Sequence, residues 1–251
     1  MALTTRTQAV RIPTPDGTAD AFAAFPAEGG PYPGVLMYMD IFGLRPVLEG
    51  MAEQLAAHGY HVLVPNLFYR HGPAPVVEPT DLRVPENREA YIKQVWPVYE
   101  QLTAALSDRD ARAYLDFLGG RPGVRPGQAG VVGYCLGGAL AVRTAAAHPE
   151  QVAAAAGFHP PLIAEGPDSP YPQAPRITAE VHLGIAAGDD EHTPGAVGVI
   201  RETLDAAGVR HTTEVYPDTA HGFTMADTAA FSPAGLELHW ERLLELLGRT
   251  L

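Results

Sequence analysis

The chain has 251 residues, of which 46% are hydrophobic, and a formal net charge of −12 at pH 7. This composition is typical of a globular protein with a sizeable core, and the acidic balance argues against binding to nucleic acid or to an anionic membrane. A single cysteine excludes an intrachain disulfide, so the composition does not indicate an oxidising compartment.

The first residues contain no apolar run long enough for a signal peptide, and no stretch approaches the ~20 apolar residues of a transmembrane helix. We therefore expect a soluble, cytoplasmic protein. The sequence indicates no particular oligomeric state.

The first third of the chain alternates between strand and helix patterns. Residues 10–26 predict two short strands around an Asp16-Gly17 turn, and residues 34–40 and 61–68 are apolar runs typical of buried strands. Between those runs, apolar residues at helical spacing predict a helix that begins near Pro46 and ends near Gly59.

The middle of the chain contains a long irregular segment. Residues 65–87 are rich in proline and charge, and a segment of this kind in a compact domain is often a functional loop or a lid. Residues 86–118 then show a helical pattern that is interrupted near Pro97.

The second half again alternates between strands and helices. Strands are predicted at 127–134, 151–160, 177–188 and 211–217, and helices at 135–149, 195–209 and 232–248. This alternation predicts a mostly parallel central sheet with helices on both faces. No linker or shift of composition divides the chain, so we expect a single α/β domain over residues 1–251.

The only cysteine lies in the stretch GYCLGG. Cys135 stands between an apolar strand and a helix of small residues, in the pattern Gly-x-nucleophile-x-Gly that forms a sharp turn called the nucleophile elbow. A thiol at the start of a helix is favoured as the thiolate, and the N–H of Leu136 would face the developing oxyanion. The alternative is an ordinary core cysteine, which does not need the closely spaced glycines Gly133 and Gly137.

A thiol nucleophile needs a base, and the base needs an acid that orients it. In open α/β sheets these groups stand in loops at the carboxyl ends of later strands. GDDEHTP offers Asp189 and Asp190 as the acid, and DTAHGF offers His221 as the base. His159 also follows a strand and can line the site. The acidic cluster at 189–192 resembles a metal site only weakly, because no other group has matching ligand spacing.

At these residues the sequence resembles the dienelactone hydrolase family of the α/β-hydrolase fold. The resemblance covers nearly the whole chain and rests on four segments in order: DIFGLRP (40–46), GYCLGG (133–138), GDDEHTP (188–194) and AHGF (220–223). It implies an α/β-hydrolase fold and a triad of Cys135, Asp190 and His221. Asp190 is selected over Asp189 because the family's aspartate is followed by three residues and then proline.

The resemblance also implies further roles at the site. The N–H of Ile41 would be the second oxyanion donor, and Asp40 would occupy the place of a family glutamate that stands beside the thiol. Aspartate is one methylene shorter than glutamate, so its reach to Cys135 would differ.

The substrate side departs from the family pattern. Family members hold a substrate carboxylate with arginines, one of them four residues after the catalytic histidine, where this chain has Met225. Arg88 and Tyr91 loosely resemble the other arginine-and-tyrosine element. A pocket with Met225 and Phe223 beside the histidine would suit a less charged ester or lactone.

These observations predict a carboxylic ester hydrolase that cleaves a small-molecule ester or enol-lactone through a thioester. No cofactor and no metal is expected. Three alternatives remain open. One is an isomerase or cyclase that uses the same site on a lactone or polyketide-type substrate, and another is a non-catalytic ligand-binding protein on a hydrolase fold. The third is a redox-sensing thiol, which is disfavoured because the chain has no second, resolving cysteine.

Overall fold

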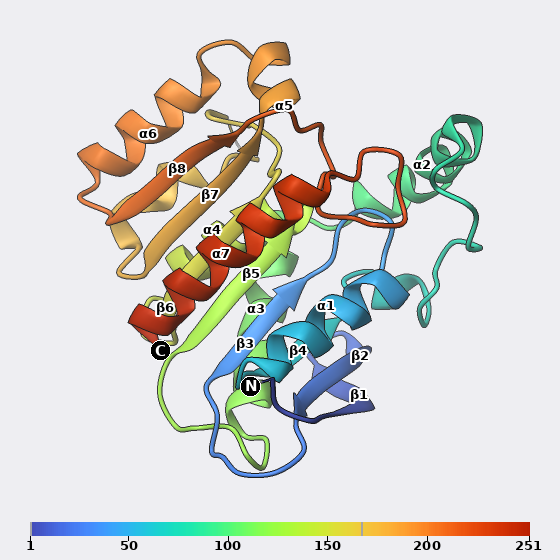
Figure 1. The fold of residues 1–251 in the computed structure, drawn as a ribbon, viewed down its shortest axis with the longest axis vertical. Coiled ribbons are helices and arrows are strands. Elements are labelled where there is room, and N and C mark those ends of the chain that lie inside the picture. The colour runs from blue at the N-terminus through green and yellow to red at the C-terminus, as the bar shows by residue number, and fades with distance from the viewer. Residues whose placement is uncertain (1, 167) are drawn as a thin grey trace.

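The computed structural model describes residues 2–166 and 168–251, which are built around one eight-stranded sheet (Figure 1). The strand order is β1-β2-β4-β3-β5-β6-β7-β8. The strands are β1 (Thr5–Thr14), β2 (Gly17–Pro26), β3 (Gly34–Tyr38), β4 (His61–Pro65), β5 (Ala129–Tyr134), β6 (Val152–Phe158), β7 (Glu180–Ala186) and β8 (His211–Tyr216). β1 and β2 form an antiparallel hairpin, β2 pairs antiparallel with β4, and the remaining pairs are parallel, which confirms the predicted mostly parallel sheet.

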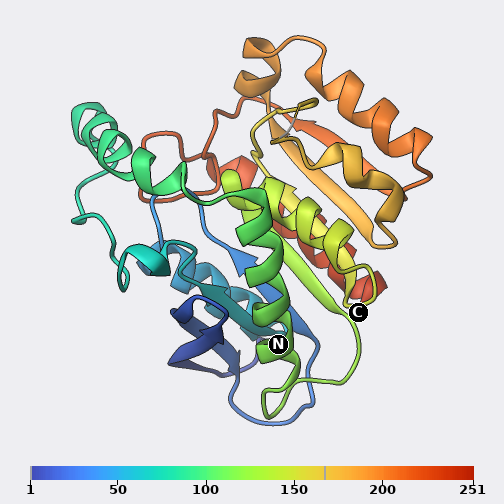
Figure 2. The same ribbon diagram turned by 180° about the vertical axis from the view of Figure 1, so that it is seen from behind.

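Helices cover both faces of the sheet, as predicted. α1 and α7 lie in front of it in Figure 1, and α3 and α4 lie in front of it in the opposite view of Figure 2. The helices are α1 (Pro46–Ala57), α2 (Pro85–Tyr99), α3 (Ala104–Gly119), α4 (Leu136–Ala147), α5 (Ala187–His192), α6 (Ala196–Ala206) and α7 (Pro233–Thr250), with short 3₁₀ turns η1 (Tyr69–His71) and η2 (Tyr171–Arg176).

The central strands are buried on both faces. Every residue of β3, β4 and β7 is buried, because each of these strands lies between helices. This burial explains the apolar sequence of β3 and the apolar centre of β4, neither of which alternates as a half-exposed strand would.

Two local predictions differ from the structure. The break in the helical region 86–118 does not fall at Pro97, which lies inside α2, but at residues 100–103. There the side chain of Thr103 accepts a hydrogen bond from the N–H of Leu106 and begins α3. The segment 187–192, expected as a loop, forms the short helix α5.

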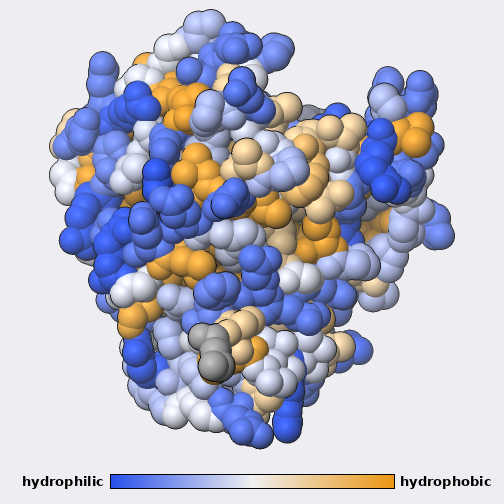
Figure 3. All heavy atoms as spheres, viewed as in Figure 1, coloured by the Kyte–Doolittle hydropathy of each residue, from blue (hydrophilic) through white to orange (hydrophobic). Residues whose placement is uncertain are grey.

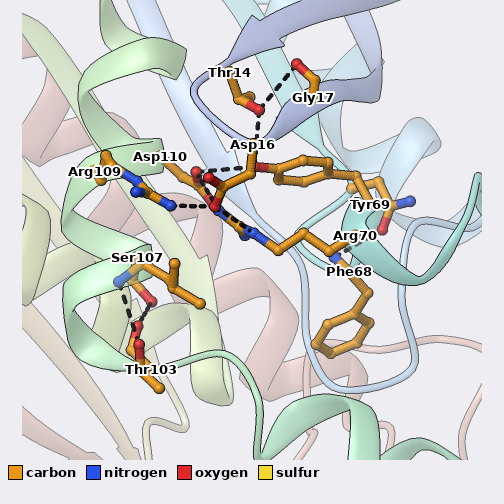
Figure 4. A network of polar contacts seen from close by, with 12 residues as sticks. Thr14, Asp16, Gly17, Phe68, Tyr69, Arg70, Thr103, Ser107, Arg109 and Asp110 are labelled. Atoms are coloured by element: carbon orange, nitrogen blue, oxygen red, sulfur yellow. Dashed lines mark hydrogen bonds and ion pairs between the residues drawn. The ribbon is translucent and has the colours of Figure 1, made fainter.

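A partly buried ion-pair cluster joins the first hairpin to η1 and α3 (Figure 4). Both guanidinium Nη atoms of Arg70 donate to the carboxylate of Asp110, at 2.7 and 2.8 Å, and Arg70 also donates to Asp16 in the β1–β2 turn. The hydroxyl of Tyr69 donates to Asp110 and accepts from Thr14. Asp110 is only 2% exposed, so these partners take the place of water around its carboxylate.

Replacing Arg70 with methionine is therefore expected to lower the free energy of unfolding by roughly 2 kcal/mol, because it leaves the carboxylate of Asp110 buried and unpaired. Arg70 retains 20% side-chain exposure, which moderates the loss relative to a fully buried pair. Urea unfolding measures the effect. The matched control is Arg112→Met, whose partner Asp116 is half exposed and needs no compensating charge. Equal urea midpoints for the two variants would contradict this account.

None of the helices within the described ranges is long and apolar enough to cross a membrane. On the face shown in Figure 3, hydrophilic residues are interspersed with small apolar patches.

The direction of the parallel strands decides where the candidate residues gather. β3, β5, β6, β7 and β8 all run the same way, so their carboxyl ends meet at one edge of the sheet. The segments that follow them carry Asp40, Cys135, His159, Asp189 and His221.

Candidate active site

Cys135 lies on a strained turn between β5 and α4. Its backbone has φ 53° and ψ −123°, a left-handed conformation that a residue with a side chain rarely adopts. A Cβ on Gly133 would lie 1.9 Å from the carbonyl oxygen of Gly137, and a Cβ on Gly137 would lie 2.5 Å from that of Met39. Both positions therefore require glycine, and the predicted elbow geometry is confirmed.

His221 lies in the loop after β8, where its Nδ1 is 2.7 Å from Oδ2 of Asp189. The prediction that Asp190 would be this partner is wrong. Residues 187–192 form the helix α5, in which consecutive side chains point about 100° apart, so only one of the two aspartates can face the imidazole. The Nδ1–H donates to Asp189, which leaves Nε2 as the nitrogen that can exchange a proton with the thiol.

The surroundings of His221 favour its charged form. Burial lowers its pKa, but hydrogen bonds to Asp189 and Cys135 and the charges of the same two groups outweigh burial and raise the pKa from 6.5 to about 10. The imidazole is therefore protonated at neutral pH and is a proton donor close to Cys135.

Two backbone N–H groups stand beside this pair. Leu136 is the first residue of α4, so its N–H has no acceptor in a preceding helical turn. The neighbours of Ile41 are engaged with Asp40: the N–H of Phe42 donates to Oδ1 at 2.9 Å and that of Gly43 to the carbonyl oxygen at 3.2 Å. Within the described residues, the N–H of Ile41 donates to no protein acceptor. Their role as oxyanion donors stays a prediction.

Asp40 does not behave as a free carboxylate beside the thiol. It lines the same cavity as Cys135 but both of its oxygens are bound by Arg45, at 2.6 and 2.9 Å. The family-based expectation of an acid beside the thiol stays a prediction. The structure adds that the carboxylate in question is paired with Arg45.

His159 is buried behind the nucleophile. Its Nδ1 accepts the N–H of Cys135 at 3.2 Å, and its Nε2 lies 2.8 Å from the hydroxyl of Thr224. Burial and the nearby charge of His221 hold its pKa well below the ordinary value, so the ring is neutral. With both nitrogens engaged, His159 offers the substrate a ring surface and not a hydrogen bond.

One cavity of roughly 190 Å³ opens onto the thiol and the imidazole. It is mostly apolar, and its lining residues are Asp40, Ile41, Phe42, Arg88, Ile92, Trp96, Cys135, His159, His221, Gly222, Met225 and Thr228. Of the five side chains expected to bind substrate, three line the cavity and two do not. Arg88, His159 and Met225 line it, whereas Tyr91 and Phe223 lie outside its lining. The hydroxyl of Tyr91 donates to the carbonyl oxygen of Phe42 at 2.8 Å, and Phe223 is buried against His159.

The segment 65–87 contributes no side chain to this cavity in the described structure. The residues at that side come from the helix α2, which begins at Pro85 and projects from the body of the molecule in Figure 1. The expectation that the segment closes over the site stays a prediction.

The sequence reading did not identify Arg45, Thr224 and Asp227 as parts of the site. Arg45 lies within the DIFGLRP segment, so the motif contained the signal, but its contact with Asp227 spans 182 positions along the chain. Thr224 and Asp227 lie in the loop after His221, and their side chains contact His159 and Arg45, which are far away in the chain. The spacing of residues in the sequence does not predict contacts between side chains that are this far apart in the chain.

A family model described as the Dienelactone hydrolase family matches residues 19–251. A protein of Methylorubrum extorquens, provisionally named a carboxymethylenebutenolidase, is 29% identical over 239 residues, which cover 93% of this chain and 78% of that protein. The carboxymethylenebutenolidase of Pseudomonas putida is 26% identical over 244 residues, which cover 96% of each chain.

Solved structures agree with this match. A crystal structure from Klebsiella pneumoniae, provisionally described as a dienelactone hydrolase, superposes with a TM-score of 0.85 at 23% identity and covers 98% of this chain and 99% of that one. A dienelactone hydrolase from Anabaena variabilis superposes with a TM-score of 0.70 at 17% identity over 98% and 99% of the chains. The fold is thus the α/β-hydrolase fold, as the sequence predicted.

Proposed function

Because the chain belongs to the dienelactone hydrolase family and is a hydrolase of esters or lactones, we propose that it works through a triad of Cys135, His221 and Asp189. The observation that carries this proposal is the position of His221. Its imidazole lies between the Asp189 carboxylate and the thiol, with its pKa raised by both. This is the arrangement that a nucleophile, a base and an orienting acid require.

The first step would form a thioester. The Cys135 thiolate attacks the carbonyl carbon of the ester or lactone, and the N–H groups of Leu136 and Ile41 stabilise the oxyanion. The carbon–oxygen bond to the leaving group then breaks. The imidazolium of His221 gives its Nε2 proton to the departing oxygen, so that an alcohol or enol is released and the imidazole becomes neutral.

The second step would regenerate the enzyme. Neutral His221 removes a proton from water, and the resulting hydroxide attacks the thioester carbon. The carbon–sulfur bond breaks, the carboxylic acid product leaves, and the thiolate again faces an imidazolium. Asp189 keeps the imidazole oriented through both steps by accepting the Nδ1–H bond.

The cavity favours a substrate without a negative charge. Met225 occupies the position where family members carry an arginine, and Ile92 and Trp96 add further apolar surface. The cation of Arg45 is already paired with Asp40. Among the described residues, Arg88 is the only arginine or lysine in the cavity lining, and its guanidinium carbon lies 5.7 Å from the centre of the Phe42 ring. Moving a carboxylate from water into such a cavity is costly unless it gains a paired cation.

We therefore expect the enzyme to hydrolyse the methyl ester of a carboxylate-bearing enol-lactone at least about tenfold faster, in kcat/KM for lactone opening, than the free acid. Lactone opening followed by absorbance measures both compounds under the same conditions. An equal or higher kcat/KM for the free acid would contradict a neutral substrate class.

Product analysis separates hydrolysis from the isomerase alternative. In a pH-stat, a hydrolase releases one equivalent of acid for each equivalent of neutral lactone consumed, whereas an isomerase or cyclase releases none. A ligand-binding protein would consume no lactone at all. Acid release that depends on Cys135 is the result expected here.

A further inference from the structure

Arg45 joins two loops that both belong to the site. It precedes α1, and its guanidinium binds Asp40 through Nη1 at 2.6 Å and Nη2 at 2.9 Å. The same guanidinium binds Asp227 through Nε at 2.7 Å and Nη2 at 3.2 Å. We call these three residues, Asp40, Arg45 and Asp227, the Arg45 bridge.

One end of the bridge fixes the loop that carries Ile41. Arg45 also donates to the carbonyl oxygen of Gly43 at 3.2 Å, and Asp40 accepts the N–H of Phe42. From the other side, Tyr91 donates to the carbonyl oxygen of Phe42. The residues on either side of Ile41 are therefore held by side chains, which sets the direction of its N–H.

The other end of the bridge lies six residues after His221, in a loop made of tight turns. The N–H of Phe223 donates to the carbonyl oxygen of Ala220 at 3.0 Å, and that of Met225 to Gly222 at 2.9 Å. The N–H of Thr228 donates to the carbonyl oxygen of Met225 at 3.1 Å. Because these turns are closed by short bonds, the position of Asp227 is tied to that of the imidazole.

From this geometry we infer that Arg45 is a positioning residue, which holds the oxyanion-binding N–H of Ile41 at a fixed distance from His221. The inference rests on the proposed function. The two loops follow different strands, β3 and β8, which are separated in the sheet by β5, β6 and β7. Their relative position therefore depends on direct contacts, and a misplacement of about 1 Å at a reacting site costs roughly a hundredfold in rate.

The alternative is that Arg45 only neutralises the buried carboxylate of Asp40. The two roles can be tested separately, because the two carboxylates that bind Arg45 differ in exposure. The side chains of Arg45 and Asp40 are 12% and 3% exposed, whereas Asp227 is 37% exposed. Asp227→Asn therefore cuts the bridge without leaving a buried charge unpaired, since the bidentate pair of Arg45 with Asp40 remains.

The experiment measures kcat, KM and thiol alkylation for the wild type and for Asp227→Asn. Turnover uses p-nitrophenyl acetate, and alkylation of Cys135 uses iodoacetamide, which needs the thiolate but no oxyanion donor. We expect Asp227→Asn to lower kcat about tenfold, with KM and the alkylation rate within about twofold of the wild type. Arg45→Met should lower kcat further, provided that its circular dichroism matches that of the wild type. Asp116→Asn, the same chemical change in an exposed pair on α3, is the matched control.

Several outcomes would overturn the inference. A kcat within twofold of the wild type in Asp227→Asn would leave Arg45 with a neutralising role alone. If the alkylation rate and kcat fell by the same factor, the substitution would be acting on the pair of Cys135 and His221 and not on the N–H of Ile41. The proposed function fails separately, if Cys135→Ala turns over the ester as fast as the wild type. In that case Cys135 is not the nucleophile, and the positioning role inferred for Arg45 is wrong as well.

Discussion

Cys135→Ala is expected to lose ester turnover by at least about four orders of magnitude, because it removes the only atom that can form the thioester. The chain contains no second cysteine that could replace it. Initial rates with p-nitrophenyl acetate, for the wild type and the variant at equal concentration, measure the loss. The substitution removes one sulfur atom from a partly buried position, so we expect its effect on folding to be small.

The control for Cys135→Ala is thermal unfolding of both proteins. Alanine has the same Cβ as cysteine, so the backbone strain at φ 53° is unchanged and the melting temperatures should agree closely. A folded variant that retains more than about 1% of the wild-type rate would contradict the role of the thiol.

Asp189→Asn is expected to lower kcat roughly 10³-fold, whereas Asp190→Asn should stay within about twofold of the wild type. The two aspartates are adjacent in α5, so the substitutions make the same chemical change in the same helix. Only Asp189 accepts the hydrogen bond from Nδ1 of His221, and its loss releases the imidazole from the required orientation. Steady-state kinetics of both variants on one ester measure the contrast. A larger loss in Asp190→Asn would reverse the assignment.

The same pair of variants changes the pH dependence in a definite direction. In the wild type, His221 loses its proton at a pH of about 10, partly because Asp189 raises its pKa. Above that pH no imidazolium remains to protonate a poor leaving group, so turnover of phenyl acetate should fall. Asp189→Asn removes one of the groups that raise the pKa of His221. The activity of this variant should therefore begin to fall at a lower alkaline pH than the activity of Asp190→Asn.

The sequence predicted most of the fold because its signals are local. The apolar runs at 34–40 and 127–134 and the helical spacing after Pro46 depend only on neighbouring residues, and each lies where it was expected. The elbow at Cys135 was also predictable, because its glycine motif is local. Gly133 is required by a contact within the turn itself, although Gly137 is required by the close approach of Met39 from another strand end.

The polar partners were harder to predict, since they depend on how helices and loops are rotated. Asp189 and Asp190 are adjacent residues of the same type, so the sequence alone does not distinguish them. The rotation of the helix α5 decides which of the two faces His221. The pairing of Asp40 with Arg45 follows from the path of one loop, and that of Arg45 with Asp227 joins residues far apart in the chain. Resemblance to a family predicts such side-chain contacts only where this chain has the same residues as the family.

The most direct test of a cysteine nucleophile is the mass of the protein during turnover. Wild type and Cys135→Ala are mixed with an activated aryl ester, quenched in acid within the first turnovers, and analysed by intact-mass spectrometry and peptide mapping. The account predicts that the wild type gains the mass of one acyl group on the peptide containing Cys135, and that the variant gains none. Turnover without this adduct in the wild type, or the same adduct in both proteins, would contradict it.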